Sequence, residues 1–97
     1  MLAVDQKLKD LGARLRRERL QRNETQSVFA ARLGISVPTF HKMESGDPKV
    51  LIGHWIAALD LLDRAHEIDG LLMEKDLFEL YETSSPMSRK RASRKQK

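Results

Sequence analysis

The spacing of apolar residues in the middle of the chain predicts two short helices, over residues 26–33 and 37–45. Apolar residues recur there three or four positions apart, which is the spacing of one inward face of an α-helix. The predicted inward positions are Phe29, Ala30, Leu33, Phe40 and Met43. The rest of the second helix is mostly polar, so we expect it to present a free outer face.

Residues that end and begin helices separate these two segments. Gly34 stands where a left-handed residue ends the first helix at low cost, and Ile35 is predicted to fill the corner. Ser36 is placed to cap the second helix, and Pro38 is tolerated because the first turn makes no intrahelical use of its N–H. Gly46, followed by Asp and Pro, is a stop signal. This arrangement is typical of a helix-turn-helix that lays its second helix in the major groove of DNA.

Two longer segments with helical spacing flank this pair, over residues 6–21 and 51–62. The inward stripe of the first is predicted to be Leu8, Leu11, Leu15 and Leu20. That of the second is predicted to be Ile52, Trp55 or Ile56, Leu59 and Leu62. We expect Trp55 to belong to the core rather than to stack on a base. A fifth helix is predicted over residues 69–81.

The segment from 68 to 81 holds more apolar residues than a four-helix core of this size has room to bury. They cover more than one helix face: Ile68, Leu71, Leu72, Met73, Leu77, Phe78, Leu80 and Tyr81. Surplus apolar surface indicates a partner, and the simplest partner is a second copy of the chain. Residues 67–83 are therefore predicted to be a dimerisation segment, in which 77–81 form either helix or a short strand.

Charge is distributed unevenly along the 97 residues. Residues 1–49 carry 10 Lys/Arg against 6 Asp/Glu, whereas residues 50–83 carry 2 against 8. The half with the paired short helices is therefore the half expected to approach phosphates. Residues 84–97 hold six Lys/Arg, no acid and few apolar residues, which predicts a disordered basic tail. Such a tail would add nonspecific DNA affinity, aid solubility or serve as a degradation handle.

Several short motifs, taken together, resemble the Cro/XRE family of bacterial and phage repressors over residues 8–62. They are Thr25-Gln26, Phe29-Ala30, Leu33-Gly34-Ile35-Ser36, Thr39-Phe40 and Glu44-Ser45-Gly46, preceded by Leu11-Gly12, Leu15-Arg16 and Arg19. The resemblance implies an all-α, four- to five-helix domain of the lambda-repressor-like helix-turn-helix type. A dimer of such units would read an inverted-repeat operator in double-stranded DNA.

The resemblance also implies roles for individual residues. The family's matching positions place Gln26, Ser36 and Ser45 on backbone phosphates, and Arg22 and Lys49 are nearby candidates. Base reading falls to the outward positions of the second helix, Val37, Pro38, Thr39, His41 and Lys42. Relatives often have Gln or Arg where this chain has Val37 and Pro38, so discrimination there would rest on thymine methyl groups or on DNA shape. The family also pairs the residues matching Arg19 and Glu44 to lock the first helix to the recognition helix.

A narrower resemblance extends past the helix-turn-helix. Residues 44–50, Gly53 and the Leu-rich segment ending at Arg64 are similar to HipB-type antitoxins, small proteins partnered with a HipA-like kinase toxin. Two functions follow as hypotheses: an antitoxin that represses its own operon and binds a toxin, or a stand-alone transcriptional regulator. The predicted organisation is a DNA-binding domain over 6–66, the dimerisation segment over 67–83 and the tail over 84–97.

Other classes of protein find no support in the sequence. The chain has no cysteine, which excludes disulfides and thiolate metal sites and suits a reducing cytoplasm. The apolar run from 51 to 62 is too short and too polar to span a bilayer, and no signal peptide is apparent. The histidines lack metal-ligand spacing, and no catalytic constellation or cofactor motif is present. We therefore expect a non-enzymatic bacterial protein in the cytoplasm, associated with the nucleoid.

Overall fold

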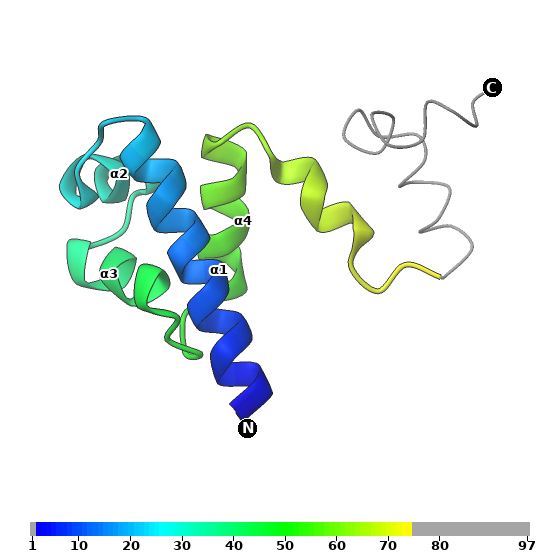
Figure 1. Cartoon of the computed structure of the whole chain (residues 1–97). Coiled ribbons are helices and arrows are strands. Elements are labelled where there is room, and N and C mark those ends of the chain that lie inside the picture. The colour runs from blue at the N-terminus through cyan, green and yellow to red at the C-terminus, as the bar shows by residue number, and fades with distance from the viewer. Residues whose placement is uncertain (1, 75–97) are drawn as a thin grey trace. The chain divides into compact units, whose positions relative to one another are not determined.

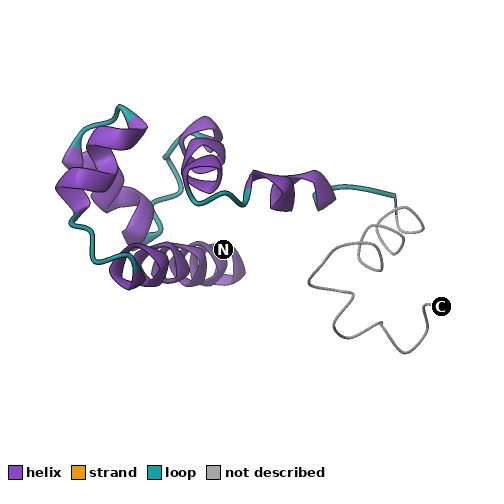
Figure 2. Cartoon of the chain, turned by 90° about the horizontal axis from the view of Figure 1, so that it is seen from above, coloured by secondary structure: helices purple, strands orange, loops and turns teal. Residues whose placement is uncertain are grey.

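The computed structural model describes residues 2–74 of the chain, and these fold entirely as helices and connecting turns (Figures 1 and 2). In chain order the elements are α1 (Leu2–Gln21), α2 (Gln26–Leu33), α3 (Val37–Ser45), α4 (Ile52–Leu61) and a 3-10 helix, η1 (Ala65–Gly70). The described residues contain no strand. The all-α prediction is therefore confirmed, and α2 and α3 have the predicted bounds.

Both short helices are capped at each end by residues that the sequence identifies, which explains why their bounds follow from the sequence. The hydroxyl of Thr25 accepts a hydrogen bond from the Val28 N–H and caps α2, and Ser36 caps α3 in the same way through Thr39 N–H. Gly34 and Gly46 end the two helices with φ of 72° and 82°, in the left-handed region that glycine adopts without strain.

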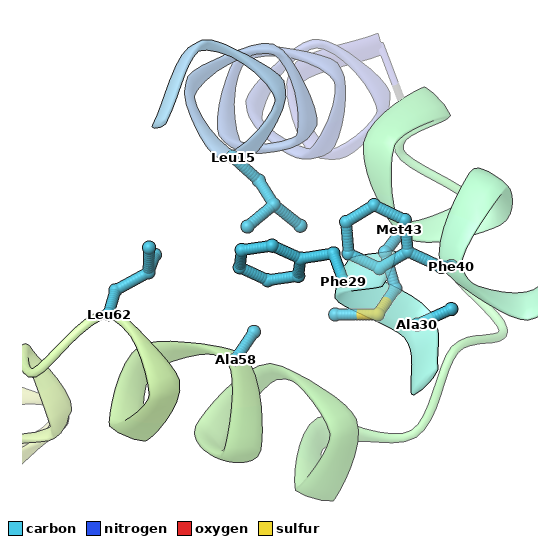
Figure 3. Packing of buried hydrophobic residues seen from close by; sticks show 7 residues of the cluster. All are labelled: Leu15, Phe29, Ala30, Phe40, Met43, Ala58 and Leu62. Atoms are coloured by element: carbon cyan, nitrogen blue, oxygen red, sulfur yellow. The ribbon is translucent and has the colours of Figure 1, made fainter. Parts of the chain in front are cut away.

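The core is small and is built around two phenylalanines from the paired helices. The rings of Phe29 and Phe40 lie 5.2 Å apart between centroids at a tilt of 36°, a favourable aromatic geometry. Figure 3 shows Leu15 reaching this pair from α1 and Ala58 from α4. The buried cluster comprises Leu15, Phe29, Ala30, Phe40, Met43, Ala58 and Leu62. Partly buried side chains pack around it, namely Leu33, Ile35, Val50, Trp55 and Leu61. Trp55 is thus a core residue, as expected.

The inward face of α1 differs from the predicted leucine stripe. Leu11 and Leu20 are exposed, at 37% and 46%, whereas Gly12 and Arg19 are buried. The inward row is therefore Leu8, Gly12, Leu15 and Arg19, which keeps helical spacing but includes a glycine and a charged residue. A search for apolar residues alone misplaces this face, because the contact with α3 needs a small residue and an ion pair there.

Three further details of the sequence prediction are corrected. The helix α1 begins at Leu2 rather than residue 6. Ile52 is 64% exposed and does not belong to the inward face of α4. Trp55 and the C-cap residue Leu62 pack inward as predicted, and Ala58 joins them. The α-helix predicted over 69–81 is absent from its described part, because η1 ends at Gly70 and a turn follows in which Leu72 has φ of 58°. Residues 75–97 lie outside the described residues, and with them the choice between helix and strand at 77–81, most of the predicted dimerisation segment over 67–83 and the predicted disordered tail over 84–97.

The chain divides into two compact units, and the division falls between Arg64 and Ala65. The first unit contains α1 to α4 and all of the individual residues predicted to read bases or contact phosphates. Within it α1 packs mainly against α3, while α2 packs against both α3 and α4. The helix α3 is therefore supported by both α1 and α2.

Candidate DNA-reading interface

The helix α3 presents most of the predicted base-reading residues to solvent. Val37, Pro38, His41 and Lys42 are exposed, and Thr39 is partly buried. The inner face of the same helix carries Phe40 and Met43, which are fully buried. Because nine residues supply both faces, the packing of the inner face fixes the direction in which the outer side chains point.

A buried ion pair holds the C-terminal half of α3 against α1. The Nε of Arg19 donates to Oε2 of Glu44 at 2.7 Å, and its Nη2 donates to Oε1 at 3.1 Å. Only 8% of the Arg19 side chain and 3% of the Glu44 side chain are exposed. The Nη1 of Arg19 donates to the carbonyl oxygen of Glu24 at 2.8 Å. Arg19 is thus committed to the interior, which leaves it little opportunity to reach a phosphate.

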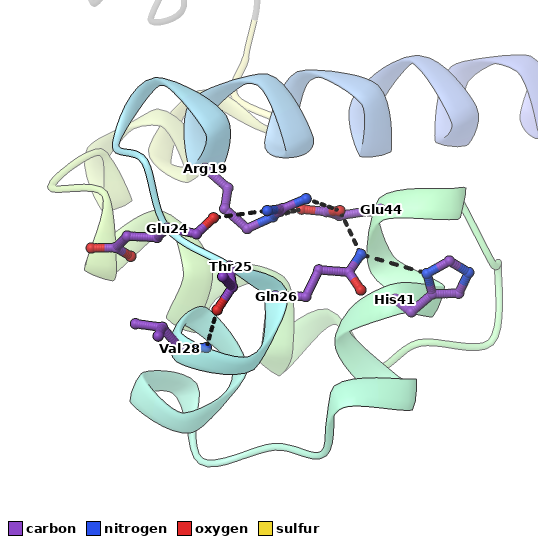
Figure 4. Close-up of polar contacts among 7 residues, drawn as sticks. All are labelled: Arg19, Glu24, Thr25, Gln26, Val28, His41 and Glu44. Carbon is purple, nitrogen blue, oxygen red and sulfur yellow. Dashed lines mark hydrogen bonds and ion pairs between the residues drawn. The ribbon is translucent and has the colours of Figure 1, made fainter.

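Gln26, the first residue of α2, is bonded to α3 on both sides of its amide nitrogen. Its Nε2 donates to Oε1 of Glu44 at 2.9 Å and lies 3.5 Å from Nδ1 of His41. Figure 4 shows these contacts continuing from Arg19 through Glu44 and Gln26 to the exposed His41. The family resemblance assigned Gln26 to a phosphate, and nothing in the sequence pattern indicated this contact with α3.

The two serines assigned to phosphates have their hydroxyls engaged within α3. Ser36 Oγ donates to Thr39 Oγ1 at 2.9 Å in addition to accepting from the Thr39 N–H. Ser45 Oγ donates to the carbonyl oxygen of Lys42 at 3.1 Å. Both serines are exposed. In this arrangement their hydroxyls stabilise the ends of the helix, and a phosphate would compete with those bonds.

The two cationic phosphate candidates occupy different places. Lys49 is exposed in the loop after α3, where its main-chain N–H donates to Asp47 Oδ1 at 2.8 Å and fixes the turn. Arg22 follows α1, and its Nη2 lies 3.5 Å from the carbonyl oxygen of Leu62 at the end of α4. Arg22 is therefore directed to the end of α4 rather than to α3.

Gly12 shapes the contact between α1 and α3, a packing role that was not predicted from the sequence. A Cβ atom at this position would collide with the main-chain carbonyl of Glu44 and lie 2.7 Å from the carbonyl oxygen of Met43. The absence of a side chain therefore lets α1 approach the backbone of α3 directly. The available signal was the helical row that joins Leu8, Gly12, Leu15 and Arg19.

Neither a metal site nor a membrane-spanning helix is found among the described residues. No group of His, Asp and Glu in residues 2–74 is arranged to hold a metal ion. Within the same range, no helix combines the length and apolar character required to cross a membrane.

The fold and the exposed helix define a class of protein: a small all-helical domain with a helix-turn-helix at its centre. Residues 10–74, more than half of the chain, match the family model described as "Helix-turn-helix domain". The chain belongs to this family of DNA-binding domains. No curated protein and no solved structure matches it.

Proposed function

We propose that this protein is a sequence-specific transcriptional repressor that reads its operator with the outer face of α3. The observation that carries the proposal is the contrast between the two faces of that helix. The inner face is anchored by a doubly hydrogen-bonded buried ion pair, while His41 and Lys42 on the outer face are exposed. A rigidly presented polar helix face matches the width of the DNA major groove.

Sequence discrimination is assigned to residues of different chemistry along α3. Lys42 donates hydrogen bonds to guanine O6 and N7, and the apolar Val37 and Pro38 contact thymine methyl groups. Phosphate contacts then fix the register without reading sequence. Exposed Lys49 and the free N–H groups in the first turn of α2, at Gln26, are the best placed for this role.

Selection of binding sites from a random duplex library, followed by sequencing, tests the proposal. We expect the wild-type chain to enrich one motif. Lys42→Ala should lose about 1–3 kcal/mol of discrimination at one base position. Lys49→Ala is the matched control, because loss of a phosphate contact weakens binding to all sequences alike and lowers the salt slope by about one. Failure of the wild-type chain to enrich any motif would refute the proposal.

We further propose that the repressor acts as a homodimer on an inverted repeat, with DNA-binding residues in 6–66, a dimerisation segment in 67–83 and a basic tail in 84–97. Exposed apolar side chains on both sides of the unit boundary support association: Leu51, Ile52 and Leu71 are each more than 60% exposed. Sedimentation of the full chain should give twice the monomer mass of 11.2 kDa at micromolar concentration. A monomer that nonetheless protects an inverted repeat would contradict the dimer in solution.

The more specific proposal is that this repressor is the antitoxin of an operon that also encodes a HipA-like kinase toxin, acting at the nucleoid in a bacterial cytoplasm. Its support is the similarity of residues 44–64 to HipB-type antitoxins, together with exposed apolar surface available to a protein partner. Affinity purification from native cells should co-elute a kinase-like protein in near-stoichiometric amount. Recovery of the repressor alone with promoter DNA would favour the stand-alone regulator.

A further inference from the structure

The Gln26 amide connects a buried carboxylate to a histidine on the recognition helix. Its Nε2 is 2.9 Å from Glu44 Oε1 and 3.5 Å from His41 Nδ1, and Figure 4 shows the amide lying between the two side chains. An amide nitrogen carries two hydrogens, one for each of these neighbours.

The orientation of this amide follows from chemistry. An ionised carboxylate only accepts hydrogen bonds, so the NH₂ group of Gln26, and not its oxygen, must face Glu44. Glu44 is itself held in place by Arg19, at 2.7 Å and 3.1 Å, and its side chain is 3% exposed. The buried ion pair therefore sets the orientation of the partly buried Gln26 amide.

The same reasoning fixes the proton on the imidazole ring. The amide nitrogen of Gln26 has no lone pair to offer, so His41 Nδ1 must be the acceptor in their contact. A neutral imidazole that accepts at Nδ1 carries its hydrogen on Nε2. We infer that Gln26 holds His41 in the Nε2–H tautomer, which makes His41 a hydrogen-bond donor and no acceptor toward DNA.

This inference rests on the proposed function and adds the chemistry of one contact. A lone donor in the major groove is satisfied by purine N7, guanine O6 or thymine O4, and it rejects the amino groups of cytosine and adenine. His41 therefore specifies an acceptor edge at the position it faces. Free neutral histidine samples both tautomers and would read either edge.

Gln26 changes its role accordingly. Both amide hydrogens face protein acceptors, and the remaining Oε1 is an acceptor that has nothing to donate to a phosphate oxygen. The Gln26 side chain is a positioning residue for His41, and any phosphate contact at this place comes from the main-chain N–H of the helix terminus. The family resemblance alone assigned the side chain to the phosphate.

Nuclear magnetic resonance of the free protein tests the tautomer independently of DNA. Long-range ¹H–¹⁵N spectra at about pH 8, where an ordinary histidine is neutral, distinguish protonated from bare ring nitrogens. We expect His41 to be protonated at Nε2 alone in the wild type and to show both tautomers in Gln26→Met, while His54 on α4 stays unchanged. An Nδ1–H signal from His41 in the wild type would overturn the inference, and so would the same ratio of His41 tautomers in the wild type and in Gln26→Met.

Gln26→Met preserves the length of the side chain but lacks donors, and Glu44 keeps both of its bonds to Arg19. The fold is therefore expected to persist, which thermal melting checks. In binding-site selection, Gln26→Met and His41→Ala should relax the same base position by about 2- to 10-fold. The double variant should be no worse than His41→Ala alone, because the two residues act through one contact.

The salt dependence of binding separates the two roles of Gln26. A positioning residue leaves the slope of affinity against salt unchanged, whereas a lost phosphate contact lowers it. Uniform weakening of all sequences by Gln26→Met, with a reduced slope, would overturn the positioning role. If the wild-type chain shows no sequence preference, the proposed function fails, and the tautomer measurement still decides the inference.

Discussion

Glu44 contributes both to the stability of the fold and to the position of the side chains proposed to read DNA. It follows His41 and Lys42 by two or three positions on α3, yet its side chain is buried against α1. Both carboxylate oxygens accept bonds, from Arg19 on one side and Gln26 on the other. A buried charge is costly unless it is paired and hydrogen-bonded in this way. Changes at Glu44 should therefore affect stability and DNA reading together.

We predict that Glu44→Ala lowers the free energy of unfolding by about 3–5 kcal/mol, because it leaves the Arg19 charge buried without its partner. Urea denaturation followed by circular dichroism measures this loss. Glu18→Ala is the matched control, since the ion pair of Glu18 with Arg64 is partly exposed and should contribute about 0–1 kcal/mol. Equal stability of the two variants would contradict a structural role for the buried pair.

At the scale of the helices, the close approach of α1 to α3 depends on the missing side chain of Gly12. The position of its Cβ is taken by the main chain of Glu44 and Met43, which has no freedom to move aside as a flexible side chain would. A larger residue must push the two helices apart and disturb the neighbouring ion pair. Interiors at native density tolerate such overpacking poorly.

We predict that Gly12→Ala destabilises the domain by about 1–3 kcal/mol through overpacking, in spite of the better helix propensity of alanine. Gly53→Ala provides the opposite control. Gly53 lies in α4 with open space around its Cβ position, so alanine there should stabilise by about 0.5–1 kcal/mol. Thermal melting of both variants tests the pair. A Gly12→Ala chain as stable as the wild type would exclude the tight α1–α3 contact.

The elements that sequence predicted best are those bounded by local chemistry. The bounds of α2 and α3 follow from Thr25, Ser36, Gly34 and Gly46, whose roles need no knowledge of distant residues. The inward face of α1 was misplaced because its choice depends on α3, a partner far away in the chain. The α-helix predicted after residue 68 is absent from its described part. Apolar spacing there is compatible with more than one backbone conformation, so it does not by itself specify an α-helix.

The site was predicted unevenly for a related reason. Exposure of His41 and Lys42 follows from the helical period once the inward residues are known. The contact of Gln26 with His41 joins residues 15 positions apart, on two helices, and depends on their relative placement. Sequence spacing within one helix carries no information on a pair that joins two helices. The hydrogen-bond network could therefore be identified only from the structure.

At the scale of the whole molecule, basic and acidic residues are concentrated in different segments of the chain. The six Lys/Arg of residues 84–97 add to the positive N-terminal half, while residues 50–83 are acidic. We predict that deletion of 84–97 weakens binding to all DNA sequences alike and lowers the slope of log affinity against log salt by up to about five. Filter binding at several salt concentrations measures this slope. An unchanged slope would contradict a DNA-binding role for this segment.

The length of α3 limits how much information one chain is able to extract from DNA. Nine residues at about 1.5 Å each give a helix about 14 Å long, which spans about four base pairs. A sequence of four base pairs recurs about once in 256, whereas a genome offers about a million competing sites or more. Because Ser36 and Gly46 cap the two ends of α3, the helix does not extend by a further turn that would contact more base pairs. Two copies on a repeated site would read about eight base pairs, which recur about once in 65,000, so pairing two chains would reduce the number of competing matches about 256-fold.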